Sequence, residues 1–127
     1  MIPTQVAVLP LIVGAAATML APPAHANDVV TYEVVSDSIS QVNGVEYVDA
    51  AGRKILRWVP LPWRLDVPLD NARGPTGPGA QVRADWLATA RPSRWVTVRI
   101  YDDGKLLCQS TLDVGNATCY GNTPEKI

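Results

Sequence analysis

Histidine is nearly absent from this 127-residue sequence, and the absence limits the chemistry the protein can perform. The single histidine, His25, lies in an N-terminal segment that we expect to be removed. Histidine is the side chain that most often transfers protons or binds metal ions near neutral pH. Without it, a serine or cysteine nucleophile would need another base. We therefore predict that the protein is not an enzyme and that it has no catalytic residue, metal site or cofactor.

The sequence also lacks an excess of either charge. Eleven basic and twelve acidic residues give a formal net charge of −1, and the two signs are interspersed without a basic block. Nucleic acids and anionic lipid surfaces both bind proteins through a dense cluster of positive charges. Neither is therefore expected to be the main partner. The adjacent acids Asp102 and Asp103 supply too few oxygens for a calcium site, which needs six or more, so they are predicted to form a turn.

The N-terminal segment has the features of a secretory signal peptide. An apolar run from Val6 to Ala21 precedes Ala24-His25-Ala26, whose small residues fit a cleavage site. Pro10 and Gly14 interrupt the run, which is shorter than the roughly 20 residues that cross a bilayer as a helix. We predict a signal peptide over residues 1–26, cleaved between Ala26 and Asn27, and a single exported domain over residues 27–127. The protein would be secreted or periplasmic within the cell envelope; the alternative is an uncleaved N-terminal membrane anchor.

The rest of the chain shows no sustained helical period but many alternations of apolar and polar residues, which predict strands. The expected strands are Val29–Val35, Val42–Val48, Lys54–Val59, Gln81–Thr89, Trp95–Tyr101, Lys105–Leu112 and Ala117–Tyr120. Prolines around Leu61–Val67 restrict that segment to an edge strand or an extended connection. About seven short strands predict an all-β fold, an immunoglobulin-like antiparallel β-sandwich or a related barrel. The segment Asn71–Gly79 is predicted to be an exposed spacer loop, with a binding loop as the alternative.

Two turns are predicted to close hairpins. Asp49-Ala50-Ala51-Gly52 follows one strand and precedes the next, and Asp102-Asp103-Gly104 is the strongest hairpin signal in the chain. A two-residue loop at Asp103-Gly104 would place Ile100 opposite Leu107 and Tyr101 opposite Leu106.

Cysteine is also scarce, since Cys108 and Cys119 are the only two. An even count in an exported chain predicts a structural disulfide. A redox pair is the poorer alternative, because such cysteines usually lie two residues apart at the start of a helix. If the turn after Leu112 centres near Asp113, the two cysteines would lie opposite one another on neighbouring strands.

Tryptophans at strand positions usually pack in the core, and we expect this for all four of them, namely Trp58, Trp63, Trp86 and Trp95. A tryptophan that is exposed instead would be the best interface candidate. Arg94, Trp95 and Arg99 together form a candidate interface, for which a salt-bridged surface is the alternative interpretation.

Several short motifs occur together in one order. They are Thr31-Tyr32-Glu33-Val34, then Val45-x-Tyr47-x-Asp49-x-x-Gly52, then Leu61-Pro62-Trp63, followed by the strand Val96–Tyr101, Asp103-Gly104 and a final Cys119. This set resembles the mycobacterial membrane protein small (MmpS) family over nearly all of Val30–Gly121. The family tends to place its first cysteine around position 98, whereas this chain has Val98 there and its first cysteine at Cys108.

Members of that family are small proteins with a β-sandwich domain outside the inner membrane, held by one N-terminal transmembrane helix. They are accessory partners of large resistance-nodulation-division transporters (MmpL), which export lipids and siderophores. The resemblance therefore implies an exported accessory protein that assists an MmpL-type transporter. The alternative is a free secreted β-sandwich domain that binds an envelope protein, a host protein or a lipid.

Overall fold

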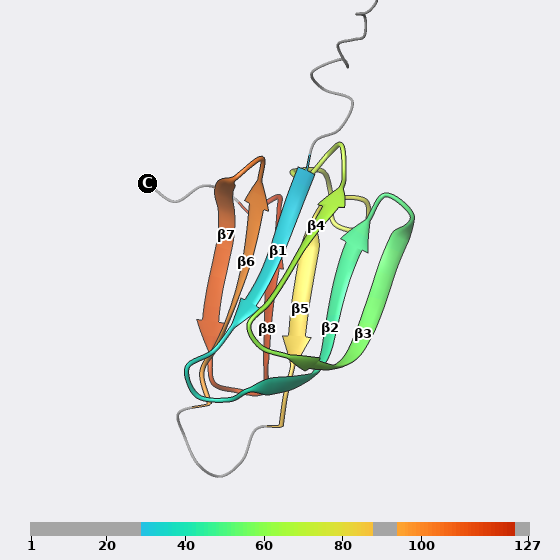
Figure 1. Cartoon of the computed structure of the whole chain (residues 1–127). Helices are drawn as coiled ribbons and strands as arrows, with labels where there is room; N and C mark the ends of the chain where they lie inside the picture. The colour runs from blue at the N-terminus through green and yellow to red at the C-terminus, as the bar shows by residue number, and fades with distance from the viewer. Residues whose placement is uncertain (1–28, 88–93, 124–127) are drawn as a thin grey trace, which may run out of the picture.

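The computed structural model describes residues 29–87 and 94–123, which form an all-β sandwich of eight antiparallel strands and contain no helix (Figure 1). The strands are β1 (Val29–Val35), β2 (Gln41–Asp49), β3 (Gly52–Pro60), β4 (Trp63–Pro68), β5 (Gln81–Asp85), β6 (Val96–Asp102), β7 (Lys105–Leu112) and β8 (Asn116–Tyr120). The all-β prediction is confirmed. Residues Leu61–Val67 supply an edge strand, β4, as expected. The predicted strand beginning at Gln81 ends at Asp85, and residues 88–93 lie outside the described part of the chain.

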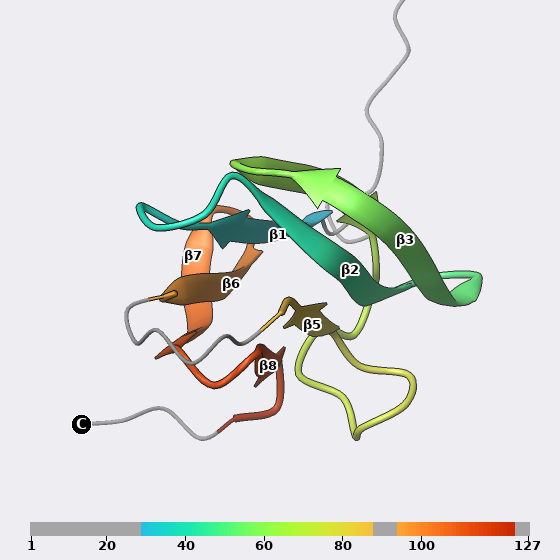
Figure 2. The same ribbon diagram turned by 90° about the horizontal axis from the view of Figure 1, so that it is seen from below.

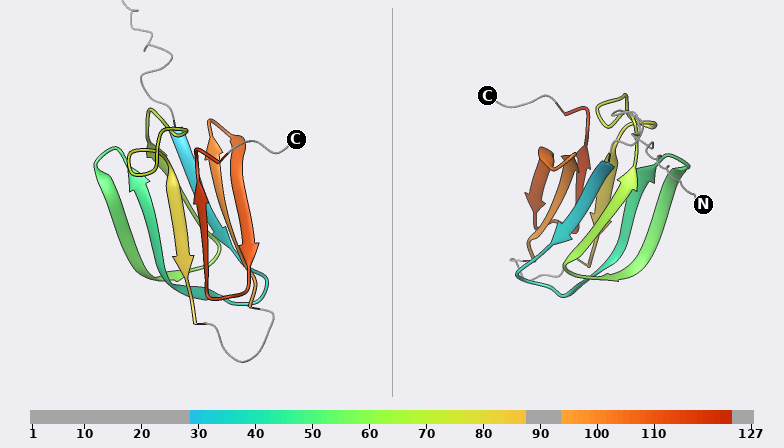
Figure 3. Two further views of the ribbon diagram at one scale, coloured as in Figure 1. Left: turned by 180° about the vertical axis from the view of Figure 1, so that it is seen from behind. Right: turned by 45° about the horizontal axis from the view of Figure 1, so that its top comes forward.

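The eight strands form two sheets that pack face to face (Figure 2). One sheet has the order β4-β1-β6-β7 and the other β3-β2-β5-β8. Strands β2 and β3 form one hairpin and β6 and β7 another, whereas the remaining connections cross from sheet to sheet. Figure 3 shows that β3 and β4 lie along one side of the sandwich and β7 and β8 along the other.

Period-2 alternation explains the core. On β1, Val30, Tyr32 and Val34 are fully buried, as the sequence predicts for one face of this strand. They face a second set of small and branched side chains on the other sheet, including Val45, Val82, Ala84 and Ala117. These side chains fill the space between the sheets.

The β6–β7 hairpin forms at the predicted turn, with one correction. Asp103 and Gly104 both have positive φ, 50° and 83°, as a tight primed turn requires. Tyr101 pairs with Leu106 as predicted. Ile100, however, pairs with Cys108 rather than Leu107, because a β-bulge shifts the register between Ile100 and Tyr101.

The predicted disulfide joins Cys108 to Cys119, whose Cα atoms are 5.8 Å apart. The expectation that the two strands neighbour each other in one sheet is wrong, because β7 and β8 belong to opposite sheets. The segment between them crosses the side of the sandwich instead of closing a hairpin. Cys108 lies beside the inward-facing Ile100 and Cys119 is buried, so the bridge links the two sheets through the interior.

Tyr32 forms a second link between the sheets. Tyr47 of β2 pairs with Val82 of β5, so the same register would place Val48 opposite Gln81. The Tyr32 hydroxyl lies between these two residues: it donates to the Val48 carbonyl at 2.6 Å and accepts from the Gln81 N–H at 3.2 Å. A side chain of one sheet thereby extends the hydrogen-bond ladder of the other. Burial raises the pKa of Tyr32 to about 12, so the hydroxyl stays protonated.

The loop Asn71–Gly79 is only partly the exposed spacer that its composition predicts. Its tip, residues 75–78, is exposed, whereas Ala72 and Gly74 are buried. The base is held by bonds from the Ala80 N–H to the Ala72 carbonyl at 3.0 Å and from the Gly121 N–H to the Ala80 carbonyl at 2.8 Å. Side chains are excluded at this contact, since a Cβ on Gly121 would lie 2.0 Å from the Ala72 oxygen.

The predicted signal peptide over residues 1–26 and its Ala26–Asn27 cleavage site lie outside the described residues, as does the start of the predicted domain at residue 27. Among residues 29–87 and 94–123, no helix is long and apolar enough to cross a membrane. The disulfide is compatible with an exported protein.

Candidate functional site

Three aromatic residues of the sequence motifs pack together at the β1, β2 and β4 side of the core. The ring centroids of Tyr32 and Tyr47 are 5.7 Å apart, and those of Tyr47 and Trp63 are 5.9 Å apart. Trp63 is partly buried against the core, as predicted. Tilted rings at these distances are favourable pairs. These motif residues therefore stabilise the fold.

The turn residues of the motifs also have structural roles. The Asp49 carboxylate accepts from the Ala51 N–H at 2.8 Å and from Lys54 Nζ at 3.2 Å, and these contacts lower the pKa of Asp49. Gly52 has a φ of 119°, which favours glycine.

The other turn and linker motifs are held by neighbouring strands. Asp103 is fixed to β1, since its N–H donates to the Val29 carbonyl at 2.9 Å and its carboxylate accepts from the Val29 N–H at 3.2 Å. The Leu61 N–H donates to the Ser40 carbonyl at 2.9 Å, just before Pro62.

Glu33 is the centre of a polar network on the outer face of the β4-β1-β6-β7 sheet. Its carboxylate accepts from Arg99 Nη1 at 2.9 Å, from Arg64 Nη1 at 3.3 Å and from the Tyr101 hydroxyl at 3.2 Å. Arg99 also donates through Nε to Gln109. Arg99 points away from the buried Val98, as predicted, and its contacts match the salt-bridged alternative for this residue.

The four tryptophans divide into two buried and two exposed residues, which corrects the expectation that all belong to the core. Trp86 is buried and Trp63 partly so, whereas Trp58 is 62 % exposed and Trp95 46 % exposed. Trp58 has a left-handed φ of 55°, so the alternation of β3 changes phase and Val59 takes the inward position instead. Trp95 directly precedes the first residue of β6, and among the described residues no strand pairs with it.

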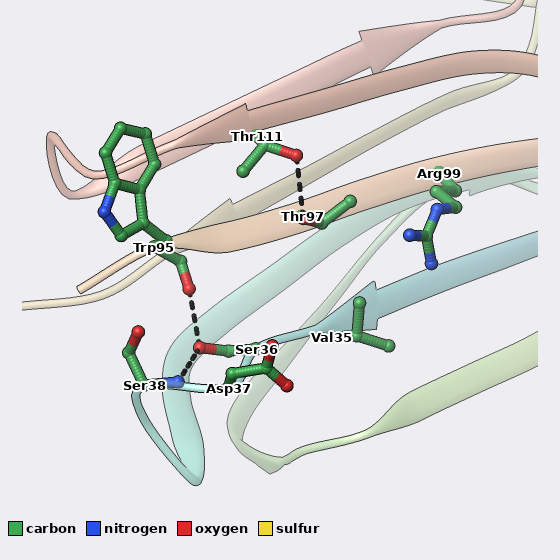
Figure 4. Close-up of a pocket in the computed structure, with 8 residues that line it drawn as sticks. All are labelled: Val35, Ser36, Asp37, Ser38, Trp95, Thr97, Arg99 and Thr111. Carbon is green, nitrogen blue, oxygen red and sulfur yellow. Dashed lines mark hydrogen bonds between the residues drawn. The ribbon is translucent and has the colours of Figure 1, made fainter. Parts of the chain in front are cut away.

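Trp95 lines a depression of about 460 Å³ on the sheet that contains β1, β6 and β7 (Figure 4). We call it the Trp95 depression. Carbon surface comes from Trp95 and Val35, and charge from Asp37 and Arg99. The remaining lining is hydroxylic and comes from Ser36, Ser38, Thr97 and Thr111. Two of the three predicted interface residues, Trp95 and Arg99, therefore meet here, whereas Arg94 does not line the depression.

The second exposed tryptophan belongs to a different surface. Ile55, Arg57 and Trp58 lie along β3, an edge strand, and all three are exposed. We call these three residues the β3 patch. A shallow hollow of about 220 Å³ adjoins it, and its lining includes Ile55, Arg57 and Gly44. Two carboxylates, Glu46 and Asp85, also line it, and these are paired with Arg53 and Arg83. By alternation, Trp58 falls on the inward face of β3, so the sequence gave no signal for this patch.

Comparison with protein-family models and with curated proteins finds no match to this chain.

Proposed function

We propose that the protein is an exported accessory protein resembling MmpS, which binds an MmpL-type transporter of the resistance-nodulation-division class and assists export of a lipid or a siderophore. The observation that supports binding to a protein is the β3 patch, where an exposed tryptophan, an exposed isoleucine and an arginine lie along one edge strand. Tryptophan and arginine are enriched among the residues that dominate binding energy at protein interfaces.

Backbone strain supports a role for Trp58 beyond folding. A left-handed φ at a bulky residue costs about 1–3 kcal/mol, and such residues concentrate at functional sites. Here the strained conformation turns the largest side chain of β3 out of the core and into solvent. Val59 takes the inward position in its place, so the backbone conformation leaves the larger of these two apolar side chains in solvent.

Charge indicates the kind of surface that would meet the β3 patch. Arg53 pairs with Glu46 at 3.2 Å and Lys54 with Asp49 at 3.2 Å, so these two cations are compensated within the sheet. Arg57 forms no ion pair with any residue of the described ranges. A partner surface with an acidic residue beside an apolar pocket would complement Arg57 and Trp58.

The position of Cys119 supports the resemblance to the family. Its Sγ lies 3.9 Å from the carbonyl oxygen of Val98, the position around which the family tends to place its first cysteine. The first cysteine departs from the family's pattern, because it is Cys108 of β7 and does not lie around position 98 in β6.

The packed interior favours a role through surfaces. Side chains from both sheets fill the space between them, so binding a long lipid there would require the sheets to separate. An accessory protein that contacts the transporter does not need to enclose the cargo.

The proposal can be tested by site-specific photo-crosslinking in cells. A photoreactive residue placed at Trp58 should capture the extracytoplasmic part of the transporter, and one placed at the exposed Leu106 of β7 serves as the matched control. Arg57→Glu should reduce co-purification of the transporter about tenfold or more, as expected for reversal of a hot-spot charge, with little change in melting temperature.

Capture at position 106 but not at 58 would contradict the assignment of the surface. If neither position captures a transporter, and deletion of the gene leaves lipid and siderophore export unchanged, the accessory role is wrong and the free secreted binding domain replaces it.

A further inference from the structure

The Trp95 depression combines an aromatic side chain with charged and hydroxyl groups, and the proposed function does not use them. Trp95 stands at one end of it and Arg99 at the other, with Thr97 and Thr111 between them (Figure 4). Its volume of about 460 Å³ falls within the roughly 300–1,000 Å³ of small-molecule sites.

Hydrogen bonds among the lining residues hold the depression in shape. The Ser36 hydroxyl donates to the Trp95 carbonyl at 2.6 Å and accepts from the N–H groups of Ser38 at 2.9 Å and Ile39 at 3.1 Å. The hydroxyls of Thr97 and Thr111 are 2.8 Å apart and bond to each other. The loop after β1 is thereby tied to the start of β6, which holds the walls of the depression in place before any ligand binds.

Two charged groups in the lining keep hydrogen-bonding capacity. The exposed Asp37 carboxylate makes no hydrogen bond or ion pair with the described residues. Arg99 uses Nη1 for Glu33 and Nε for Gln109, and its Nη2 makes no hydrogen bond within the same ranges. The depression therefore offers a free acceptor and a free donor as well as the indole of Trp95.

This combination favours one ligand class. An apolar chain would cover Asp37 and Arg99 without pairing them, which is unfavourable. A simple anion or cation would pair with one of these two charged groups and leave the other unused, and Arg99 is already compensated by Glu33. A neutral ligand with many hydroxyl groups and one face of C–H groups uses all three features, because it can lie on the indole of Trp95 while its hydroxyls bond to both charged residues.

We infer that the Trp95 depression binds a neutral carbohydrate. One sugar ring stacks on Trp95, and hydroxyls of that ring and of the next sugar unit along the chain donate to Asp37 and accept from Arg99 Nη2. This site is separate from the β3 patch, which belongs to the opposite sheet. The inference therefore stands whether or not the protein serves a transporter.

Titration of the purified exported protein with neutral oligosaccharides tests the inference. The probes are hexasaccharides of glucose in β-1,4 and α-1,4 linkage, of N-acetylglucosamine and of mannose, each added up to about 10 mM, the range of weak single-ring recognition. The readout is the indole N–H signal of Trp95 in a nitrogen–proton correlation spectrum. At least one hexasaccharide should shift this signal in a saturable manner.

Three variants assign the binding to named side chains. Trp95→Ala should weaken binding about tenfold or more through loss of the stacking surface, and Asp37→Asn should weaken it about threefold to tenfold while preserving the shape of the loop. Trp58→Ala, the other exposed tryptophan, is the matched control and should bind as tightly as the unaltered protein.

The inference is overturned if no hexasaccharide of the panel shifts the Trp95 signal at 10 mM, or if Trp95→Ala and Asp37→Asn both bind as the unaltered protein does. It is also overturned if polygalacturonate fragments or a fatty acid bind at this signal more tightly than every neutral sugar. If Trp95→Ala fails to fold, the Asp37→Asn result decides between the outcomes.

Discussion

Replacing Tyr32 by phenylalanine removes one oxygen atom that serves both sheets. The hydroxyl is the partner of the Val48 carbonyl, at 2.6 Å, and of the Gln81 N–H, at 3.2 Å, and all three residues are buried. Phenylalanine fits the space left by tyrosine, so packing changes little. The main consequence is that a buried carbonyl and a buried N–H at the end of the β2–β5 ladder both lose their partner.

The size of the effect follows from these two groups. A buried polar group left without a partner costs about 1–3 kcal/mol, so the two groups together should lower the free energy of unfolding of Tyr32→Phe by about 2–6 kcal/mol. Small domains are only marginally stable, so this loss is a large fraction of the total free energy of unfolding. Loss of the link between β1 and the opposite sheet should also speed local opening of the β2–β5 end, which amide exchange at Gln81 would detect.

Urea unfolding followed by tryptophan fluorescence measures the loss directly. With an m-value of about 1–2 kcal/mol/M, the midpoint of Tyr32→Phe should fall by about 1–6 M. Tyr47→Phe is the matched control, because the Tyr47 hydroxyl forms no hydrogen bond with the described residues and its loss should cost less than about 1 kcal/mol. Equal stabilities for the two variants would refute the reasoning and indicate that Val48 and Gln81 can bond directly to each other.

Three further predictions concern pH, the disulfide and the outer face. Because burial raises the pKa of Tyr32 to about 12 from its ordinary 10.0, the unfolded chain loses this proton first. Stability should therefore be unaffected below pH 10 and fall by about 2–3 kcal/mol between pH 10 and 12, a loss absent from Tyr32→Phe in alkaline urea titrations. The bridge between Cys108 and Cys119 closes a short loop, so replacing both cysteines by serine should lower the free energy of unfolding by about 3 kcal/mol. An unchanged melting temperature would contradict a structural role of the bridge. Glu33→Gln should cost about 1 kcal/mol at low ionic strength and less at 1 M salt, whereas a salt-independent cost would point to packing instead of charge.

The strands were predictable from the sequence because their information is local. Alternation of apolar and polar residues sets the inward face of β1, and the pair Asp103-Gly104 favours the positive φ angles that the β6–β7 turn adopts. The disulfide was predictable from cysteine count alone. In each case the residues that determine the feature lie next to one another or are too few to pair otherwise.

The arrangement of β7 and β8 was not predictable on the same basis. Turn residues at 113–115 indicate that the chain reverses, but they are equally compatible with a hairpin and with a crossing to the opposite sheet. The choice depends on where β5 lies, since β8 pairs with β5 over Gln81–Asp85. Residues that pair over such a distance in the sequence leave no local pattern. That the disulfide joins opposite sheets therefore followed from the topology alone.

The β3 patch was missed and the Trp95 depression only half found from the sequence, for related reasons. Trp58 occupies an inward position by period, and its exposure depends on one left-handed φ for which a tryptophan gives no signal. Trp95 and Arg99 were grouped by their nearness in sequence, but the acceptor that completes the depression, Asp37, comes from the loop after β1. The hydrogen bond from Ser36 to the Trp95 carbonyl brings the two segments together.

The filled space between the sheets directs both proposals to the exposed tryptophans on the surface. The disulfide on one side and the Tyr32 hydroxyl within the core resist separation of the sheets, so the interior cannot open for a ligand without loss of both links. The same links hold the β3 patch and the Trp95 depression in a fixed relation, since each belongs to a different sheet. Their chemistries are also distinct: the β3 patch presents an apolar side chain and an unpaired cation, which suits a protein, whereas the Trp95 depression presents balanced charge and hydroxyls, which suits a sugar. The two proposals therefore place a protein partner and a glycan on opposite sheets of one domain.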